Sequence, residues 1–216
     1  KDYSLGGITL LCKFDGQRVT MASQIAGADE TVSSLYSVKS EQATMLSFDT
    51  YNYLVHYFGQ PQGSMADDPN GTLGGDYEFV ISDATADRIE LKGKKYGNRI
   101  VMKAFSADQT WKQYLTRIKK VEDDAFFYEY DLRMDGLYTG QMLRSNYTFI
   151  VTYYDEVGKV YQKTVPFMFT TDGMRFHEPV TIDGQTMQNF VWKNEEISFV
   201  CTDEGCLLYT SDAADE

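Results

Sequence analysis

The sequence has little histidine, tryptophan, proline or cysteine: two, two, four and three residues, respectively, among 216. The two histidines, His56 and His177, belong to no H-E-x-x-H motif, and the chain has neither a G-x-S-x-G nor a G-x-x-x-x-G-K motif. The spacings that hold a zinc ion, a nucleophilic serine or a nucleotide phosphate are therefore missing. We expect a protein that is not an enzyme of these classes, and catalysis by carboxylates dispersed in the sequence stays open.

The chain also lacks long hydrophobic runs and an excess of cations. Its apolar runs fall far short of the ~20 residues of a membrane-spanning helix. It starts at Lys1 with no initiator Met and no signal peptide, which predicts a fragment or a trimmed mature chain. Twenty Lys and Arg are outnumbered by 32 Asp and Glu, and the net charge of −12 disfavours binding to nucleic acid or to an anionic membrane surface. The apolar fraction of 43% is enough for a sizeable core.

Residues 206–216 resemble a translated transposase-type sequencing adapter rather than protein sequence. We therefore expect the genuine sequence to stop near Gly205, and we leave the tail out of the fold prediction. Two cysteines then remain, Cys12 and Cys201. They are compatible with a disulfide in an oxidising compartment or with two ordinary buried thiols.

What the chain does contain is alternation of apolar and polar residues, most clearly in residues 75–105. Tyr77, Phe79 and Ile81 alternate with Glu78, Val80 and Ser82, and a similar pattern follows in residues 88–92 and 99–105. A period of two predicts three consecutive strands. The last two strands are joined by a turn in which Gly97 and Asn98 tolerate a positive φ.

Two segments have the spacing of a helix instead. Apolar residues recur every three or four positions near 107–121, after an S-x-x-Q capping box formed by Ser106 and Gln109. A shorter helix is expected near 50–58, with Asp49 as its N-cap and Gly59 as its stop.

From Phe126 onward the period of two returns, with Asp-Gly turns between strands. The sequence therefore predicts a mainly β protein with minor α (α+β), built from antiparallel hairpins or a meander that can curl into a barrel. We expect an N-terminal β-rich lobe in residues 1–105, a linking helix in 106–122, a C-terminal β-meander lobe in 123–205 and a non-native tail in 206–216.

Candidate binding residues gather in two places. One group, beside the short helix, is aromatic or histidine, and the other lies in or near the glycine-rich loop (residues 60–75) and the basic turn (residues 95–98). The candidates are Tyr53, His56, Tyr57, Asp67, Asp68, Asp76, Lys94, Lys95 and Tyr96. The acids of the loop offer oxygen ligands for Ca²⁺, although their spacing is not that of an EF-hand. Each group also has an ordinary structural interpretation: a hydrogen-bonded histidine, solvated loop acids, and an edge strand protected by lysines. No other cofactor is expected.

Five short strings of the sequence are shared with a known family: Lys13–Asp15, Arg18–Met21, Leu46–Asn52 with His56 following, Gly75–Phe79 and Leu91–Lys95. On these strings the chain resembles the domain of unknown function 4302 family of Bacteroidota lipoproteins, most closely over residues 8–105. The resemblance implies an exported, lipid-anchored protein at the outer membrane or cell surface, beside nutrient-uptake machinery. It implies no activity, and the anchoring cysteine is not in this sequence.

These observations lead to a functional hypothesis of non-enzymatic binding. The domain would bind a glycan, a peptide or an outer-membrane uptake protein, and surface aromatics would supply the contacts. A hydrolase with dispersed carboxylates and a structural or adhesive surface module are the alternatives.

Overall fold

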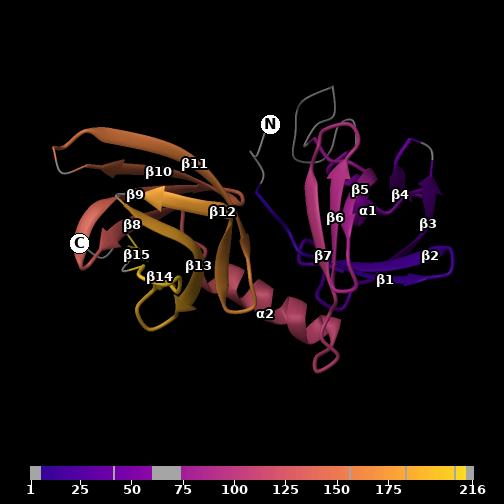
Figure 1. Cartoon of the computed structure of the whole chain (residues 1–216). Helices are drawn as coiled ribbons and strands as arrows, with labels where there is room; N and C mark the ends of the chain where they lie inside the picture. Colours follow the sequence, from indigo (N-terminus) through magenta and orange to yellow (C-terminus); the bar gives the residue numbers. More distant parts are fainter. Residues whose placement is uncertain are drawn as a thin grey trace. The chain divides into compact units, whose positions relative to one another are not determined.

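The computed structural model describes residues 6–40, 42–59, 74–155, 157–182, 184–206 and 208–212. The chain forms two compact units: unit 1 comprises residues 10–113, and unit 2 comprises residues 6–9 together with residues 114–212. Both are built on antiparallel β-sheet, and the described residues contain two α-helices (Figure 1). The expected class, mainly β with minor α, is confirmed. Neither helix is long and apolar enough to span a membrane.

Unit 1 is a seven-stranded open sheet in which the strands follow one another in chain order. Its elements are β1 (Leu10–Asp15), β2 (Arg18–Ser23), β3 (Val32–Ser40), β4 (Thr44–Phe48), α1 (Tyr53–His56), β5 (Glu78–Ala84), β6 (Arg88–Gly93) and β7 (Arg99–Lys103). The two edges of the sheet are β1 and β7. The period of two predicted β5, β6 and β7 because their alternate residues face a core while the others face solvent.

The core of unit 1 is apolar and draws on both the sheet and α1. Leu54 and Val55 of α1 pack against residues of β2, β4, β5 and β6, which are Val19, Met21, Leu46, Phe48, Phe79 and Leu91. The predicted cap of this helix is wrong. Asn52 is the N-cap, because its side chain accepts a hydrogen bond from Leu54 N at 3.1 Å. The Asp49 carboxylate instead accepts a hydrogen bond from Ser47 Oγ at 2.7 Å. Asp49 comes three residues before Asn52, too early in the chain for its side chain to cap the first helical turn.

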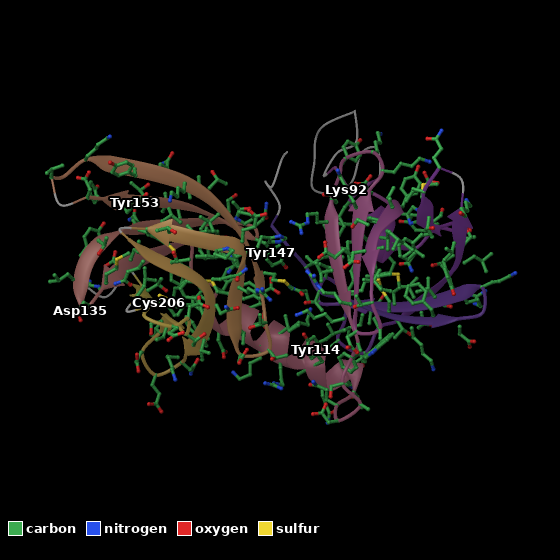
Figure 2. All side chains as sticks on the ribbon, viewed as in Figure 1. Lys92, Tyr114, Asp135, Tyr147, Tyr153 and Cys206 are labelled. Carbon is green, nitrogen blue, oxygen red and sulfur yellow. A yellow bond between two sulfur atoms is a disulfide. The ribbon has the colours of Figure 1, made fainter. Side chains whose placement is uncertain are left out.

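Unit 2 contains a closed barrel in the strand order β10-β11-β12-β13-β14-β15-β8-β9. Its elements are α2 (Trp111–Asp124), which starts three residues before the unit, β8 (Glu129–Met134), β9 (Leu137–Ser145), β10 (Thr148–Tyr154), β11 (Val160–Phe169), β12 (Gly173–Ile182), β13 (Gln185–Lys193), β14 (Ser198–Cys201) and β15 (Leu208–Asp212). Aromatic rings fill the barrel, among them Phe149 and Phe167, which stack with centroids 4.3 Å apart. Figure 2 shows the side chains of this unit as sticks, with Tyr147, Tyr153 and Cys206 among those labelled.

The long helix α2 starts later than the sequence predicted. Its capping box is Thr110 and Gln113, not Ser106 and Gln109: Gln113 N donates to Thr110 Oγ1 at 3.2 Å, and Thr110 N donates to Gln113 Oε1 at 2.9 Å. Both tetrapeptides fit the capping-box pattern. The second directly precedes the apolar stripe whose members Leu115, Ile118 and Val121 are buried, and this position sets the start of the helix.

Residues of the segment 206–216 take part in the fold, and the prediction that this segment is non-native stays a prediction. Residues 208–212 form β15, which pairs with both β14 and β8 and so closes the barrel. Cys201 forms a disulfide with Cys206, with their Cα atoms 6.0 Å apart, and not with Cys12. Cys12 is a free thiol on β1, and burial raises its pKa to about 12. The pairing with Cys206 was missed because residues 206–216 had been set aside.

Candidate functional site

The segment 74–77 connects the turn after α1 to the loop between β6 and β7. Gly75 N donates to Phe58 O at 2.7 Å, and Asn98 Nδ2 donates to Gly74 O at 2.5 Å. A side chain cannot replace the hydrogen of Gly75, because a Cβ there would lie 2.4 Å from Phe58 Cβ. This close contact brings the short helix and the basic loop into one surface of unit 1.

Asp76 is the residue that fixes the β6–β7 loop. Its carboxylate accepts hydrogen bonds from Lys95 N at 2.7 Å, Tyr96 N at 3.0 Å and Asn98 N at 3.2 Å, and from Asn98 Nδ2 at 2.7 Å. It is only 7% exposed, and a Cβ at Gly93 would lie 1.8 Å from its Oδ2 atom. Several N–H donors on one carboxylate make a rigid loop. The expected positive φ of Asn98 is wrong, because Asn98 holds this turn through its side chain and only Gly97 takes the left-handed φ, at 77°.

The predicted Ca²⁺ site stays a prediction. Asp67 and Asp68 lie outside the described residues, and the oxygens of Asp76 are already occupied by N–H donors. Among the residues that the structure describes, no group of three or more His, Cys, Asp or Glu could hold a metal ion.

The loop held by Asp76 presents Lys94, Lys95 and Tyr96 on the surface. Lys94 Nζ forms an ion pair with Glu78 Oε2 at 3.0 Å. Lys95 Nζ lies 4.7 Å from the centroid of the Tyr96 ring, and a hydrogen bond to the Tyr96 side chain raises the pKa of Lys95. The backbone N–H of Lys95 donates to the Asp76 carboxylate at 2.7 Å, so Lys95 lies beside the segment 74–77.

Three rings form what we call the aromatic platform: Tyr51, His56 and Tyr77. The His56 ring stacks on Tyr77 with centroids 5.2 Å apart and lies 5.4 Å from the ring of Tyr51. His56 Nδ1 is 2.9 Å from Asn52 O and 3.1 Å from Asn52 N, which ties the imidazole to the start of α1. Tyr51 is 61% exposed and Tyr77 is 47% exposed. The platform therefore joins a fixed ring to two exposed rings.

The structure brings together only part of the predicted set. His56, Asp76, Lys94, Lys95 and Tyr96 lie on or beside the segment 74–77. Tyr53 belongs elsewhere: its hydroxyl donates to Glu30 Oε1 at 2.5 Å, and burial together with Glu30 raises its pKa to about 12.

Tyr57 packs edge-on against Phe58, with centroids 5.2 Å apart, and is not in the platform. Tyr51 and Tyr77 were missed. Tyr51 is two residues from Tyr53, and nothing in the sequence distinguishes the exposed ring from the hydrogen-bonded one.

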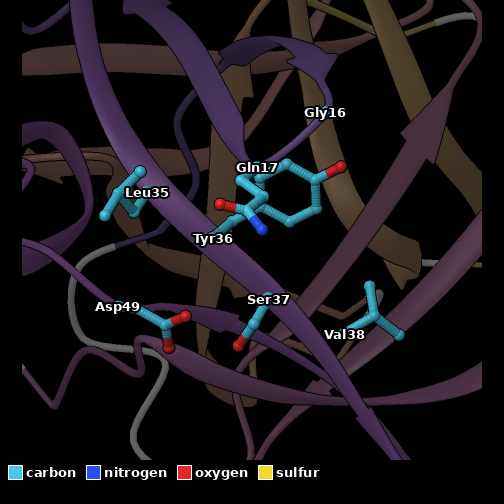
Figure 3. A pocket seen from close by; sticks show the side chains of 7 residues that line it. All are labelled: Gly16, Gln17, Leu35, Tyr36, Ser37, Val38 and Asp49. Atoms are coloured by element: carbon cyan, nitrogen blue, oxygen red, sulfur yellow. The ribbon is translucent and has the colours of Figure 1, made fainter.

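A second surface feature is a pocket of about 500 Å³ beside β3 (Figure 3). It is lined by Gly16, Gln17, Leu35, Tyr36, Ser37, Val38 and Asp49. At this pocket β3 changes its partner, because Val32–Leu35 pair with β2 whereas Tyr36–Ser40 pair with β4. The neighbouring Ser37 and Ser47 hydroxyls, together with Lys39, lower the pKa of Asp49, and Ser47 Oγ donates a hydrogen bond to its carboxylate at 2.7 Å. An ionised carboxylate held in this way is a poor general acid.

Two further carboxyls have lowered pKa values. The Lys159 N–H, which donates to Asp155 Oδ1 at 2.9 Å, lowers the pKa of Asp155. Burial acts to raise the pKa of Asp203, but hydrogen bonds from Asn189 and Gln188 and the charge of Arg175 outweigh it and lower the pKa. A hydrolase that protonates a leaving group needs a carboxyl with a raised pKa. These three carboxyls are shifted in the opposite direction.

Fold and surface together define an antiparallel β protein with a rigid, ring-bearing surface on its open-sheet unit. The chain belongs to the DUF4302 family, whose description is "Domain of unknown function (DUF4302)" and whose model matches residues 1–194. The resemblance predicted from the sequence is thus confirmed at the level of the family. No curated protein and no solved structure matches the chain. The family match ends before β14 and β15, the strands that complete the barrel.

Proposed function

We propose that this domain is a non-enzymatic binding module that takes a glycan on the aromatic platform, as part of an exported, lipid-anchored component of a nutrient-uptake system. The observation that carries the proposal is that the His56 ring contacts the rings of both Tyr51 and Tyr77, and that both tyrosines are exposed. Exposed rings on a globular protein mark a binding site when they are clustered and held in place.

The chemistry of the platform suits a sugar. The C–H face of a pyranose stacks on an aromatic ring, and tyrosine adds a hydroxyl that hydrogen-bonds to the sugar hydroxyls. Lys95 supplies a donor beside the platform, since its backbone is bound to Asp76, the neighbour of Tyr77 in the chain. The segment 74–77 and the loop held by Asp76 keep these groups in place before a ligand arrives, which lowers the entropy cost of binding.

The test is a binding screen of the folded protein against glycan oligosaccharides, followed by titration calorimetry of each hit. Removal of both platform tyrosines, in Tyr51→Ala with Tyr77→Ala, is expected to weaken binding about tenfold or more. The matched control is Phe126→Ala with Tyr128→Ala, because those rings are 64% and 71% exposed and contact each other at 5.7 Å in unit 2.

Three results would count against the proposal. The first is a loss of glycan binding in the control variant as large as in the platform variant. The second is unchanged glycan binding without the platform tyrosines. The third is release of shortened sugars during the titration. The last would favour the hydrolase alternative. If the platform binds peptides but not glycans, the proposed ligand is wrong, and the aromatic platform is still the binding surface.

A further inference from the structure

The outward face of the β6–β7 hairpin carries positive charge in a protein whose net charge is −12. Residues on this face are Arg88, Glu90 and Lys92 of β6 and Arg99, Val101 and Lys103 of β7, while Ile89, Leu91, Ile100 and Met102 face the core. Four cations thus share a face with one acid, Glu90. Glu90 pairs with Arg88 at 2.6 Å and with Arg99 at 3.7 Å. Lys92 lies on β6 in Figure 2.

The register sets these cations directly against one another. Arg88 is opposite Lys103, and Lys92 is opposite Arg99. Gly93 N donates to Asn98 O at 2.7 Å, and alternate pairs of an antiparallel ladder exchange hydrogen bonds, so both cation pairs fall at non-hydrogen-bonded positions. Opposing side chains are closest there, at a Cα separation of ~4.5 Å. Like charges in this arrangement disfavour the hairpin, and an anionic partner relieves them.

The backbone of β7 places hydrogen-bonding groups beside these positive charges. Among the described residues, β7 pairs with β6 alone and forms one edge of the sheet. By the same alternation, the N–H and C=O groups of Val101 and Lys103 point away from β6, toward the edge of the sheet. Val101 is 43% exposed between the two cations. The edge therefore offers donors, acceptors, two positive charges and an apolar position in strand register.

We propose that β7 is a docking edge for an acidic extended segment of a partner protein, which adds to the sheet as an eighth strand. Acidic side chains of that segment lie opposite Arg99 and Lys103, an apolar side chain lies opposite Val101, and the residues between them extend the apolar inner face. Acids four residues apart in a strand are ~13 Å apart, as are Arg99 and Lys103.

Charge and backbone pairing favour an acidic strand at this edge over a second copy of the chain and over an anionic polysaccharide. A second copy of the chain, paired through its own β7, would set cations against cations, which excludes it. An anionic polysaccharide would meet the charges but could not satisfy alternate backbone donors and acceptors. The edge is separate from the aromatic platform, so this inference does not depend on the proposed glycan binding.

The experiment uses the full chain and the fluorescent peptide Thr-Glu-Ile-Val-Leu-Glu-Thr, followed by fluorescence anisotropy. Saturable binding is expected, with loss of binding when both Glu are replaced by Lys or when the amides that face β7 are N-methylated. Lys103→Glu is expected to weaken binding about tenfold. Lys13→Glu, which makes the same change of charge on β1 at the other edge, leaves it unchanged.

A charge swap fixes the register. Of the two peptides with a single Glu replaced by Lys, one is expected to bind the Lys103→Glu variant at least as tightly as the parent peptide binds the wild type. No binding of the parent peptide to the folded wild type overturns the proposal. Equal binding of the N-methylated and the parent peptide overturns the proposal as well. So does a Lys103→Glu substitution that weakens the binding of dextran sulfate but not of the peptide. Either outcome shows a site for polyanions and not for a strand.

Discussion

Asp76 and Asn98 hold each other through two hydrogen bonds, because the Asp76 carboxylate accepts from both the backbone N–H and the side-chain amide of Asn98, at 3.2 and 2.7 Å. Asp76 lies just before β5, and Asn98 lies at the end of the loop between β6 and β7. Their contact closes the base of the loop that presents Lys95 and Tyr96, and it joins that loop to Gly74 and Tyr77. The geometry of the candidate surface therefore depends on one buried carboxylate.

The first prediction concerns that carboxylate. Asp76→Ala leaves the N–H groups of Lys95, Tyr96 and Asn98 without their acceptor, so the free energy of unfolding is expected to fall by about 2–4 kcal/mol. Urea denaturation measures the change, with Asp87→Ala as the control because Asp87 is an exposed acid in the turn between β5 and β6 of the same unit. Equal midpoints for the two variants would show that Asp76 does not organise the loop.

The two adjacent capping-box patterns give a paired test of the start of α2. Thr110→Ala removes the acceptor for Gln113 N and is expected to cost about 1 kcal/mol. Ser106→Ala, in the pattern that the sequence favoured, is expected to change stability by less than about 0.5 kcal/mol. Thermal unfolding of both variants checks the assignment, and a larger effect at Ser106 would contradict it.

Local patterns in the sequence were enough to predict the strands, but not to predict the caps of the helices or the candidate site. Alternation of apolar and polar residues predicted β5, β6 and β7, since each strand has one face on the core. The caps were misplaced because Asp49 and Ser106 fit the cap patterns as well as Asn52 and Thr110 do. Only the packing of the helices decides between them.

The contacts that build the candidate surface join residues far apart in the chain. Asp76 meets Lys95, Tyr96 and Asn98 across 19 to 22 positions. Whether Tyr51 is exposed depends on where α1 packs, not on its neighbours in sequence. The disulfide partner of Cys201 was missed for another reason, because the segment that contains Cys206 had been excluded on its resemblance to an adapter.

Asp203 gives a prediction in pH. Its pKa is lower in the folded protein, so the stabilisation is fully present above the unfolded pKa of about 4 and is lost as the pH falls through the folded value. Asp203→Asn is therefore expected to be less stable than wild type at pH 7, and the difference is expected to narrow at acidic pH. Denaturant titrations at several pH values measure it, with the exposed Asp108→Asn as control. A difference that widens at low pH would contradict the assignment.

Deletion of residues 206–216 tests the role of β15. Without β15 the edges of β8 and β14 lose their common partner, and hydrogen exchange at Leu132 and Val200 is expected to accelerate about tenfold or more, with β2 and β6 unaffected. Cys206→Ser separates the disulfide from the strand and is expected to cost about 2 kcal/mol. Unchanged exchange in β8 after the deletion would show that the barrel does not need this strand.

The last prediction concerns the cost of the positive face. Lys103 lies opposite Arg88, so Lys103→Glu turns a repulsive cross-strand pair into an attractive one, and we expect the free energy of unfolding to rise by about 0.5–1 kcal/mol. Lys13 lies opposite Thr20, and Lys13→Glu should leave stability nearly unchanged. Urea denaturation at low ionic strength measures both, and added salt should shrink the gain because it screens exposed charges. A loss of stability in Lys103→Glu would mean that the cations do not repel, and would remove the physical reason for an anionic partner on β7.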